Sequence, residues 1–170
     1  YAERIQLFRL PPGESWRRAT GLPRAAYGMT LSHLGLAVLV AGVTASSAWQ
    51  TEVIRSMAPG DSQEVAGYSF VFEGVEPVQG PNYVADRGRF EVFSDGDMIA
   101  VMEPEKRQFF VQTMQTTEAA IRTTLMADLY VVLGDQGEGS SWAVRLYHNP
   151  LVPWIWGGCL LMVFGGLISL

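Results

Sequence analysis

The chain is poor in cysteine, histidine and charge. Its 170 residues include one cysteine, Cys159, and two histidines, and 17% of them are charged, against about 25% in typical soluble domains. One cysteine excludes an internal disulfide framework, and the sequence contains no CxxC, HExxH, GxSxG or P-loop pattern. These absences exclude zinc sites built on paired cysteines and the best-known hydrolase and nucleotide-binding motifs.

Charge is missing altogether from two long stretches. Residues 25–51 contain no Asp, Glu, Lys or Arg, and neither do the residues Leu151–Leu170. A helix crosses a bilayer with about 20 apolar residues, so these stretches predict transmembrane helices at 25–50 and 150–170. Because the chain starts at Tyr1 and ends inside an apolar run, we expect it to be a segment of a longer protein.

Basic charge is scarce between the two predicted helices. Residues 1–24 carry five arginines and two glutamates, a net +3, whereas residues 52–150 carry 7 basic and 15 acidic side chains, a net −8. The positive-inside rule then makes 1–24 a cytoplasmic connector and puts domain 51–149 outside, in the periplasm of a bacterium, with both helices in the inner membrane. Membrane lipid is an expected partner. The acidic balance argues against nucleic acid.

The segment between the helices has the pattern of a β domain. Tyr68–Val75 alternates aromatic and β-branched residues with the period of two that is typical of a strand. A hairpin turn is predicted at Ser94–Asp97 and a helical turn near 116–121. Further strands are predicted at 83–85, 89–93, 98–102, 109–113, 128–133 and 142–147. The expected fold class is a membrane protein in which two transmembrane α-helices flank a small, mainly antiparallel β domain, either a sandwich or a small barrel.

His33 lies inside the first apolar stretch and is the main candidate for chemistry. An ionisable side chain within a membrane span usually faces a partner, a cavity or a bound group, and imidazole is a common ligand of metals and haem iron. Two interpretations stay open: a ligand or proton relay, or a histidine hydrogen-bonded to a neighbouring helix. The same helix face carries small or short side chains, at Ala26, Thr30, Ala37, Val40 and Thr44.

Several other features have structural interpretations. Small residues at helical spacing predict close helix packing; they are Gly28, Gly35 and Gly42 in the first span and Gly157, Gly158, Gly165 and Gly166 in the second. His148 is interpreted as an interfacial histidine, with a second metal ligand as the alternative. The charged residues 103–107 are expected to form solvated faces or structural pairs. Glu118 and Arg122 have the i,i+4 spacing of a pair, if that segment is helical.

Three stretches of the chain resemble a known family. They are residues 22–35 (LPRAAYGMTLSHLG), the segments 105–107, 116–123 and 128–131, and residues 149–158 (NPLVPWIWGG). In this order and with this topology, they resemble the CcmF/NrfE family of cytochrome c maturation proteins, often called haem lyases. The resemblance covers nearly the whole chain and corresponds to about the C-terminal quarter of the family's proteins.

The resemblance implies a polytopic inner-membrane protein that joins haem to the CXXCH motifs of apocytochrome c. Its implied partners are apocytochrome c, a periplasmic haem chaperone and other cytochrome c maturation membrane proteins. By its place in the motif, His33 would be one axial iron ligand of a haem b, the second ligand lying outside this chain. The segment would then be a component of a haem lyase, inactive alone and without a catalytic residue of its own, and its outer domain would be a docking surface.

Two other functions remain open at this point. In the first, the chain is a membrane-tethered periplasmic interaction domain without haem, and His33 only packs. In the second, it is a piece of a transporter in which His33 relays protons.

Overall fold

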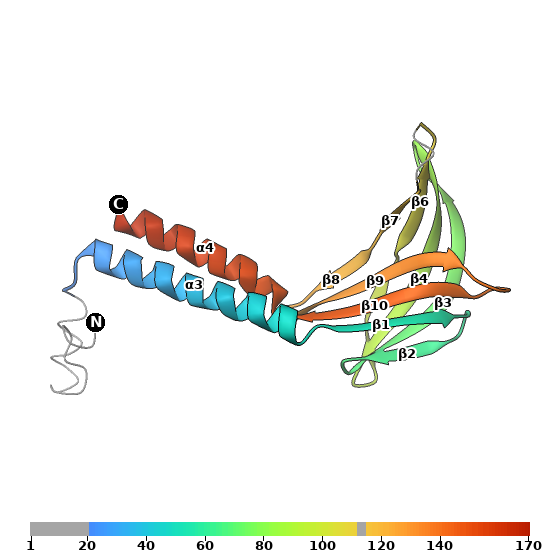
Figure 1. Ribbon diagram of the computed structural model, residues 1–170, viewed down its shortest axis with the longest axis horizontal. Helices are drawn as coiled ribbons and strands as arrows, with labels where there is room; N and C mark the ends of the chain where they lie inside the picture. Colours follow the sequence, from blue (N-terminus) through green and yellow to red (C-terminus); the bar gives the residue numbers. More distant parts are fainter. Residues whose placement is uncertain (1–20, 112–114) are drawn as a thin grey trace. The chain divides into compact units, whose positions relative to one another are not determined.

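The computed structural model describes residues 21–111 and 115–170, so most of the predicted connector 1–24 lies outside the described residues. The chain divides into two compact units. One contains helix α3 (Arg24–Ala48) as far as Ala41, together with helix α4 (Val152–Ser169) from Trp154, and the other contains residues 42–153. Both helices are long and apolar enough to cross a membrane, judged by length and composition (Figure 1).

Within the first unit, α3 and α4 approach each other at their glycines. A Cβ atom built on Gly158 would lie 2.6 Å from both the carbonyl oxygen of Gly35 and the amide nitrogen of Leu39. A Cβ atom on Gly165 would lie 2.5 Å from the amide nitrogen of Ser32. These glycines therefore bring one helix backbone against the other, as their spacing predicted. The same prediction was wrong for Gly157 and Gly166, where a Cβ atom would meet nothing within 4 Å.

The second unit contains a β-sandwich of two antiparallel sheets (Figure 1). Sheet A has the order β1 (Thr51–Met57), β10 (Trp142–Pro150), β9 (Ala127–Gln136) and β8 (Ala120–Thr123). Sheet B has the order β2 (Ser62–Val65), β3 (Tyr68–Gln79), β4 (Tyr83–Ser94), β6 (Glu105–Phe109) and β7 (Gln115–Glu118), and β5 (Asp97–Met102) pairs with the other end of β4. The expected antiparallel β domain between two apolar helices is confirmed.

Aromatic side chains at alternate positions of β3 and β4 form the centre of the core. Phe70, Phe72 and Phe90 are fully buried, and the rings of Phe72 and Phe90 stack with centroids 4.8 Å apart. Strand β9 faces them with Leu129 and other alternate aliphatic side chains. Because a strand sends successive side chains to opposite faces, this alternation gives each sheet one apolar face, and the two apolar faces pack together.

The structure confirms some local predictions and corrects others. Asp95 and Gly96 both have positive φ, 53° and 89°, which is the geometry of a two-residue hairpin at the predicted turn. The helical turn predicted near 116–121 was wrong. That region forms β7 and β8, which are rich in β-branched residues and pair with β6 and β9. Of the strand predicted at 109–113, Phe109 is the last residue of β6 and residues 110–111 form a turn, while residues 112–113 lie outside the described residues.

Candidate functional site

His33 is exposed on α3, and its ring orientation is set by its own helix. Its Nδ1 atom lies 2.7 Å from the carbonyl oxygen of Met29, one turn earlier. A carbonyl oxygen can only accept, so Nδ1 donates and carries the proton. In a neutral imidazole the lone pair is then on Nε2, the atom that points away from the bonded turn. His33 is thus held as the tautomer that can bind a metal through Nε2.

The face of α3 that carries His33 differs from the face that packs on α4. His33 lies about 160° around the helix from Gly35, at about 100° per residue. Gly28 and Gly35 are buried, and the Ser32 hydroxyl donates to the carbonyl of Met162 in α4. On the His33 face, Thr30, Ala37 and Val40 are exposed.

His33 presents a single imidazole on a face with small side chains, and an imidazole nitrogen can act as one ligand of a metal or of haem iron. Among residues 21–111 and 115–170, no three His, Cys, Asp or Glu side chains gather in a way that could hold a metal ion. The chain's described part therefore lacks a closed metal site, and the donor set around His33 is compatible with a group whose other ligands come from elsewhere.

His148 lies in β10 within the sandwich and packs against an aromatic ring. Its ring centroid is 5.9 Å from that of Tyr68, with the two planes tilted by 32°. Burial lowers the pKa of His148 below its ordinary value of 6.5, because the charged form loses solvation. These contacts support a packing role for His148 as a neutral side chain.

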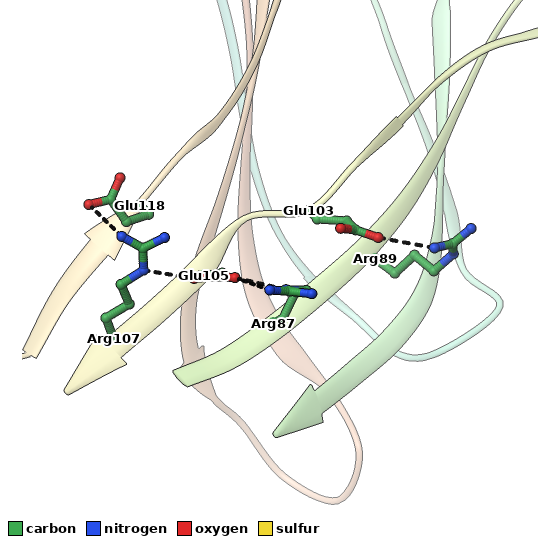
Figure 2. Close-up of polar contacts among 6 residues, drawn as sticks. All are labelled: Arg87, Arg89, Glu103, Glu105, Arg107 and Glu118. Carbon is green, nitrogen blue, oxygen red and sulfur yellow. Dashed lines mark hydrogen bonds and ion pairs between the residues drawn. The ribbon is translucent and has the colours of Figure 1, made fainter. Parts of the chain in front are cut away.

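A charged cluster lies on sheet B, where β4, β6 and β7 are neighbours (Figure 2). The strand registers set both Arg87 and Glu118 directly opposite Glu105. Glu105 accepts hydrogen bonds from Arg87 Nε at 2.8 Å and from Arg107 Nε at 2.7 Å. Arg107 also forms an ion pair with Glu118, at 3.3 Å, and its guanidinium lies 4.7 Å from the ring centroid of Tyr83.

Glu105 is the buried member of this cluster, with 6% of its surface exposed. Burial by itself would raise the pKa of the Glu105 carboxyl, but the hydrogen bonds from Arg107 and Arg87 outweigh it, and the pKa lies below its ordinary value. The expected structural pairing of this segment is confirmed. The Glu118–Arg122 pair was expected only if the segment were helical; both residues are in strands, and Glu118 pairs with Arg107.

An open pocket of about 490 Å³ lies on sheet B, and we call it the sheet B pocket. Strands β3, β4, β6 and β7 line it with Pro77, Val78, Gln79, Val84, Ala85, Asp86, Lys106, Gln108 and Gln115. Lys106 also forms an ion pair with Asp135 of β9. The lining combines amide side chains with exposed Val84, which suits contact with a polypeptide better than with a small apolar ligand.

Sequence reasoning identified His33 but not Arg87 or this pocket. The pocket's residues come from four strands, and only strand registers bring Gln79 beside Val84 and Val84 beside Gln108. The sequence carries no local signal for that arrangement, because a register is set by contacts between distant segments.

The comparisons with known proteins agree with one another. Residues 48–150 match the family described as "CcmF C-terminal beta-sandwich". The chain is 47% identical over 164 residues to the cytochrome c-type biogenesis protein ccl1 of Rhodobacter capsulatus, covering 92% of this chain and 25% of that protein. It is 44% identical over 151 residues to the cytochrome c-type biogenesis protein CcmF of Pseudomonas aeruginosa, covering 89% of this chain and 23% of that protein.

A solved structure has the same fold. The cytochrome c haem lyase CcmF superposes with a TM-score of 0.72 and 20% identity, over 99% of this chain and 27% of that one. The chain therefore spans about a quarter of the length of the proteins that it matches.

Proposed function

Because the chain belongs to the CcmF family of cytochrome c-type biogenesis proteins, we propose that it works in cytochrome c maturation. It forms part of a membrane haem ligase that attaches haem to the CXXCH motifs of apocytochrome c. Within that protein, α3 supplies His33 as one axial ligand of a haem b, and the β-sandwich supplies a docking surface. The second axial ligand comes from another part of the protein.

The observation that carries this proposal is the state of the His33 ring. A histidine that only packed would be expected to bond to a neighbouring helix, but its Nδ1 instead donates to the carbonyl of Met29 in its own helix. This bond fixes the ring and leaves the Nε2 lone pair facing away from α3. A hydrogen bond from the second ring nitrogen to a backbone carbonyl is the arrangement that orients metal-binding histidines.

The residues around His33 suit a flat group beside the helix. The small side chains of Thr30 and Ala37 leave room next to the imidazole. The Thr30 hydroxyl donates a hydrogen bond to the carbonyl oxygen of Ala26 at 2.9 Å, so it already has a partner within α3. A haem b held there would supply one-electron transfer. The protein's part is to hold Nε2 unprotonated, to fix the ring and to keep water away through the surrounding apolar helices.

The membrane arrangement follows from the two helices and the distribution of charge. We infer that α3 and α4 cross the bacterial inner membrane, with the arginine-rich residues 1–24 in the cytoplasm and the acidic sandwich in the periplasm. Apocytochrome c, a periplasmic haem chaperone and other maturation membrane proteins would meet the sandwich there. The sheet B pocket is the candidate place, since its amide side chains can bond to a peptide backbone.

The role of His33 is tested by a reduced-minus-oxidised absorption spectrum of the full-length membrane protein. We expect His33→Gly to lose the b-type signal while the protein still inserts and accumulates, and added imidazole to restore part of that signal. The matched control is His148→Gln, which should keep the signal. An unchanged spectrum in His33→Gly would contradict the proposal.

The docking role is tested by crosslinking full-length protein to an apocytochrome c peptide that contains CXXCH. Val84→Arg fills the sheet B pocket with a large cation and should reduce capture at least several-fold. Met98→Arg changes another exposed apolar residue, in β5 and outside this pocket, and should leave capture unchanged. Equal capture by both variants would show that the sheet B pocket is not the docking site.

A second candidate function is favoured by the self-contained core of the sandwich. Residues of both sheets form one buried cluster that includes Phe70, Val131 and Val144. Such a domain could serve as a membrane-tethered interaction module without haem. A spectrum lacking any b-type signal, together with peptide capture that depends on Val84, would favour this function over the first.

A further inference from the structure

The turn between β8 and β9 exposes two large apolar side chains. Leu125 is 75% exposed and Met126 is 58% exposed. The turn is closed by Thr124, whose amide and hydroxyl both donate to the carbonyl of Ala127, at 2.9 and 2.8 Å. Its backbone bonds are thus satisfied locally, and the two central side chains project from a well-defined hairpin rather than from an irregular loop.

This turn is tied by a backbone hydrogen bond to the residue that precedes α4. The amide of Leu151 donates to the carbonyl of Met126 at 2.7 Å, and Val152 is the first residue of α4. The strand register leads to the same point, since Pro150 pairs with Ala127. Leu151 has φ of +57°, a conformation that L-residues with large side chains rarely adopt, so the junction has a specific geometry that brings this turn beside the helix start.

The start of the apolar run then sets the depth of the turn. Residues 151–170 contain no Asp, Glu, Lys or Arg, and the polar residues His148 and Asn149 come just before them. Because a helix that crosses a bilayer keeps its apolar run within the hydrocarbon core and polar residues outside it, Val152 at the start of α4 lies at the edge of the hydrocarbon. Leu151 and the bonded Met126 carbonyl then lie in the interfacial layer, where apolar side chains are favoured over exposure to water.

We propose that the β8–β9 turn is a membrane anchor, with Leu125 and Met126 inserted among the lipid headgroups and the adjoining acyl chains. This inference rests on the proposed crossing of the membrane by α4. The anchor holds the sandwich against the lipid surface at a third point, in addition to the two helix connections. It therefore limits rotation of the docking domain about those connections.

The inference is tested by fluorescence in vesicles of phosphatidylcholine. The full-length membrane protein, in a background free of other reactive cysteines that includes Cys159→Ser, is labelled with an environment-sensitive NBD probe at Leu125→Cys and, in a second variant, at Met126→Cys. Two positions serve as controls: Val163→Cys on the exposed side of α4 and Glu138→Cys in the turn between β9 and β10. Quenching by lipids with a nitroxide near the headgroups reports contact of the turn labels with the bilayer, and quenching by lipids with a nitroxide near the end of the acyl chain reports insertion of the Val163→Cys label.

We expect both turn labels to be blue-shifted and quenched at least three-fold more than the Glu138→Cys label, with the Val163→Cys label also quenched. If Val163→Cys is quenched but the turn labels behave like Glu138→Cys, the anchor is disproved and the membrane crossing stands. Turn labels that are blue-shifted but not quenched would show burial against protein, which also overturns the proposal. If Val163→Cys is not quenched, the crossing itself fails and the anchor fails with it.

Discussion

At the scale of single residues, backbone and side-chain partners determine the state of each ionisable group. His33 is held by a carbonyl of its own helix, whereas Glu105 is held by two guanidinium groups from neighbouring strand positions. The first arrangement fixes the orientation of the imidazole ring, and the second favours the ionised form of the carboxylate by lowering the pKa of Glu105. The first is a candidate for ligand binding, and the second stabilises sheet B.

Removing the charge of Glu105 should destabilise the sandwich. In Glu105→Gln, two arginines lose a charged acceptor in a largely buried position, and we expect the free energy of unfolding to fall by about 2 kcal/mol. The control is Glu103→Gln, which breaks the pair with Arg89 at 3.0 Å. Because that pair is exposed, its loss should cost roughly 0.5 kcal/mol or less. Urea unfolding in mild detergent measures both; equal losses would contradict the special role of Glu105.

His148 should make the stability of the sandwich depend on pH. Its pKa in the folded state lies below the ordinary value of 6.5 because burial disfavours the charged form. The unfolded chain therefore binds the proton more readily, so the contribution of His148 is complete above pH 6.5 and declines as the pH falls below that value.

The variant His148→Gln cannot take up this proton. Its free energy of unfolding should fall less than that of the natural protein when the pH is lowered from about 7.5 to about 5.5. Parallel curves for the two proteins over that range would show that His148 is not the group responsible.

At the scale of elements, the two faces of each helix make different contacts: one face packs against the other helix and the opposite face is exposed. On α4, Gly158 and Gly165 contact the backbone of α3, and Gly157 and Gly166 do not. On α3, the glycine face is covered by α4 while the His33 face is not. The adjacent residues Gly157 and Gly158 therefore allow a test of helix packing in which the residue type is the same and only the helix face differs.

Substitution of Gly158 should separate the helix pair. In Gly158→Leu the new side chain meets backbone atoms of Gly35 and Leu39, which cannot move aside as a flexible side chain could. We expect a loss of about 1–3 kcal/mol in stability and a longer distance between spin labels attached at Val40 and Leu160. Gly157→Leu, one residue away on the open face, should change neither quantity. Similar effects of the two variants would argue against glycine-mediated packing.

At the scale of the whole molecule, the sandwich is a compact unit with its own core. Residues of β3, β4, β9 and β10 bury their side chains against one another within residues 42–153. The family match covers 48–150, nearly the same span. A fragment of these residues should therefore fold without the helices and unfold cooperatively with heat, as followed by circular dichroism. A broad, non-cooperative transition would show that the core depends on the rest of the chain.

Several features of this protein can be predicted from local sequence because their causes are local. Long runs without charge predict apolar helices, alternation with period two predicts strands such as β3, and Asp95-Gly96 predicts a hairpin turn. The isolated His33 could be identified as a candidate because a polar residue is unexpected in such a run. The helical turn expected near 116–121 failed since pairing with β6 and β9 outweighs local propensity.

Other features depend on contacts between segments that are distant in the chain. No local pattern shows that Glu105 lies opposite Arg87, that Val84 lies beside Gln108, or that the Met126 carbonyl bonds to Leu151. Strand register and helix facing decide these contacts, and both are set by how whole faces pack together. Composition and periodicity therefore predict the two helices, the β domain and His33 as a candidate residue. The charged cluster, the sheet B pocket and the hydrogen-bonded β8–β9 turn exist only because folding brings separate strands into one register.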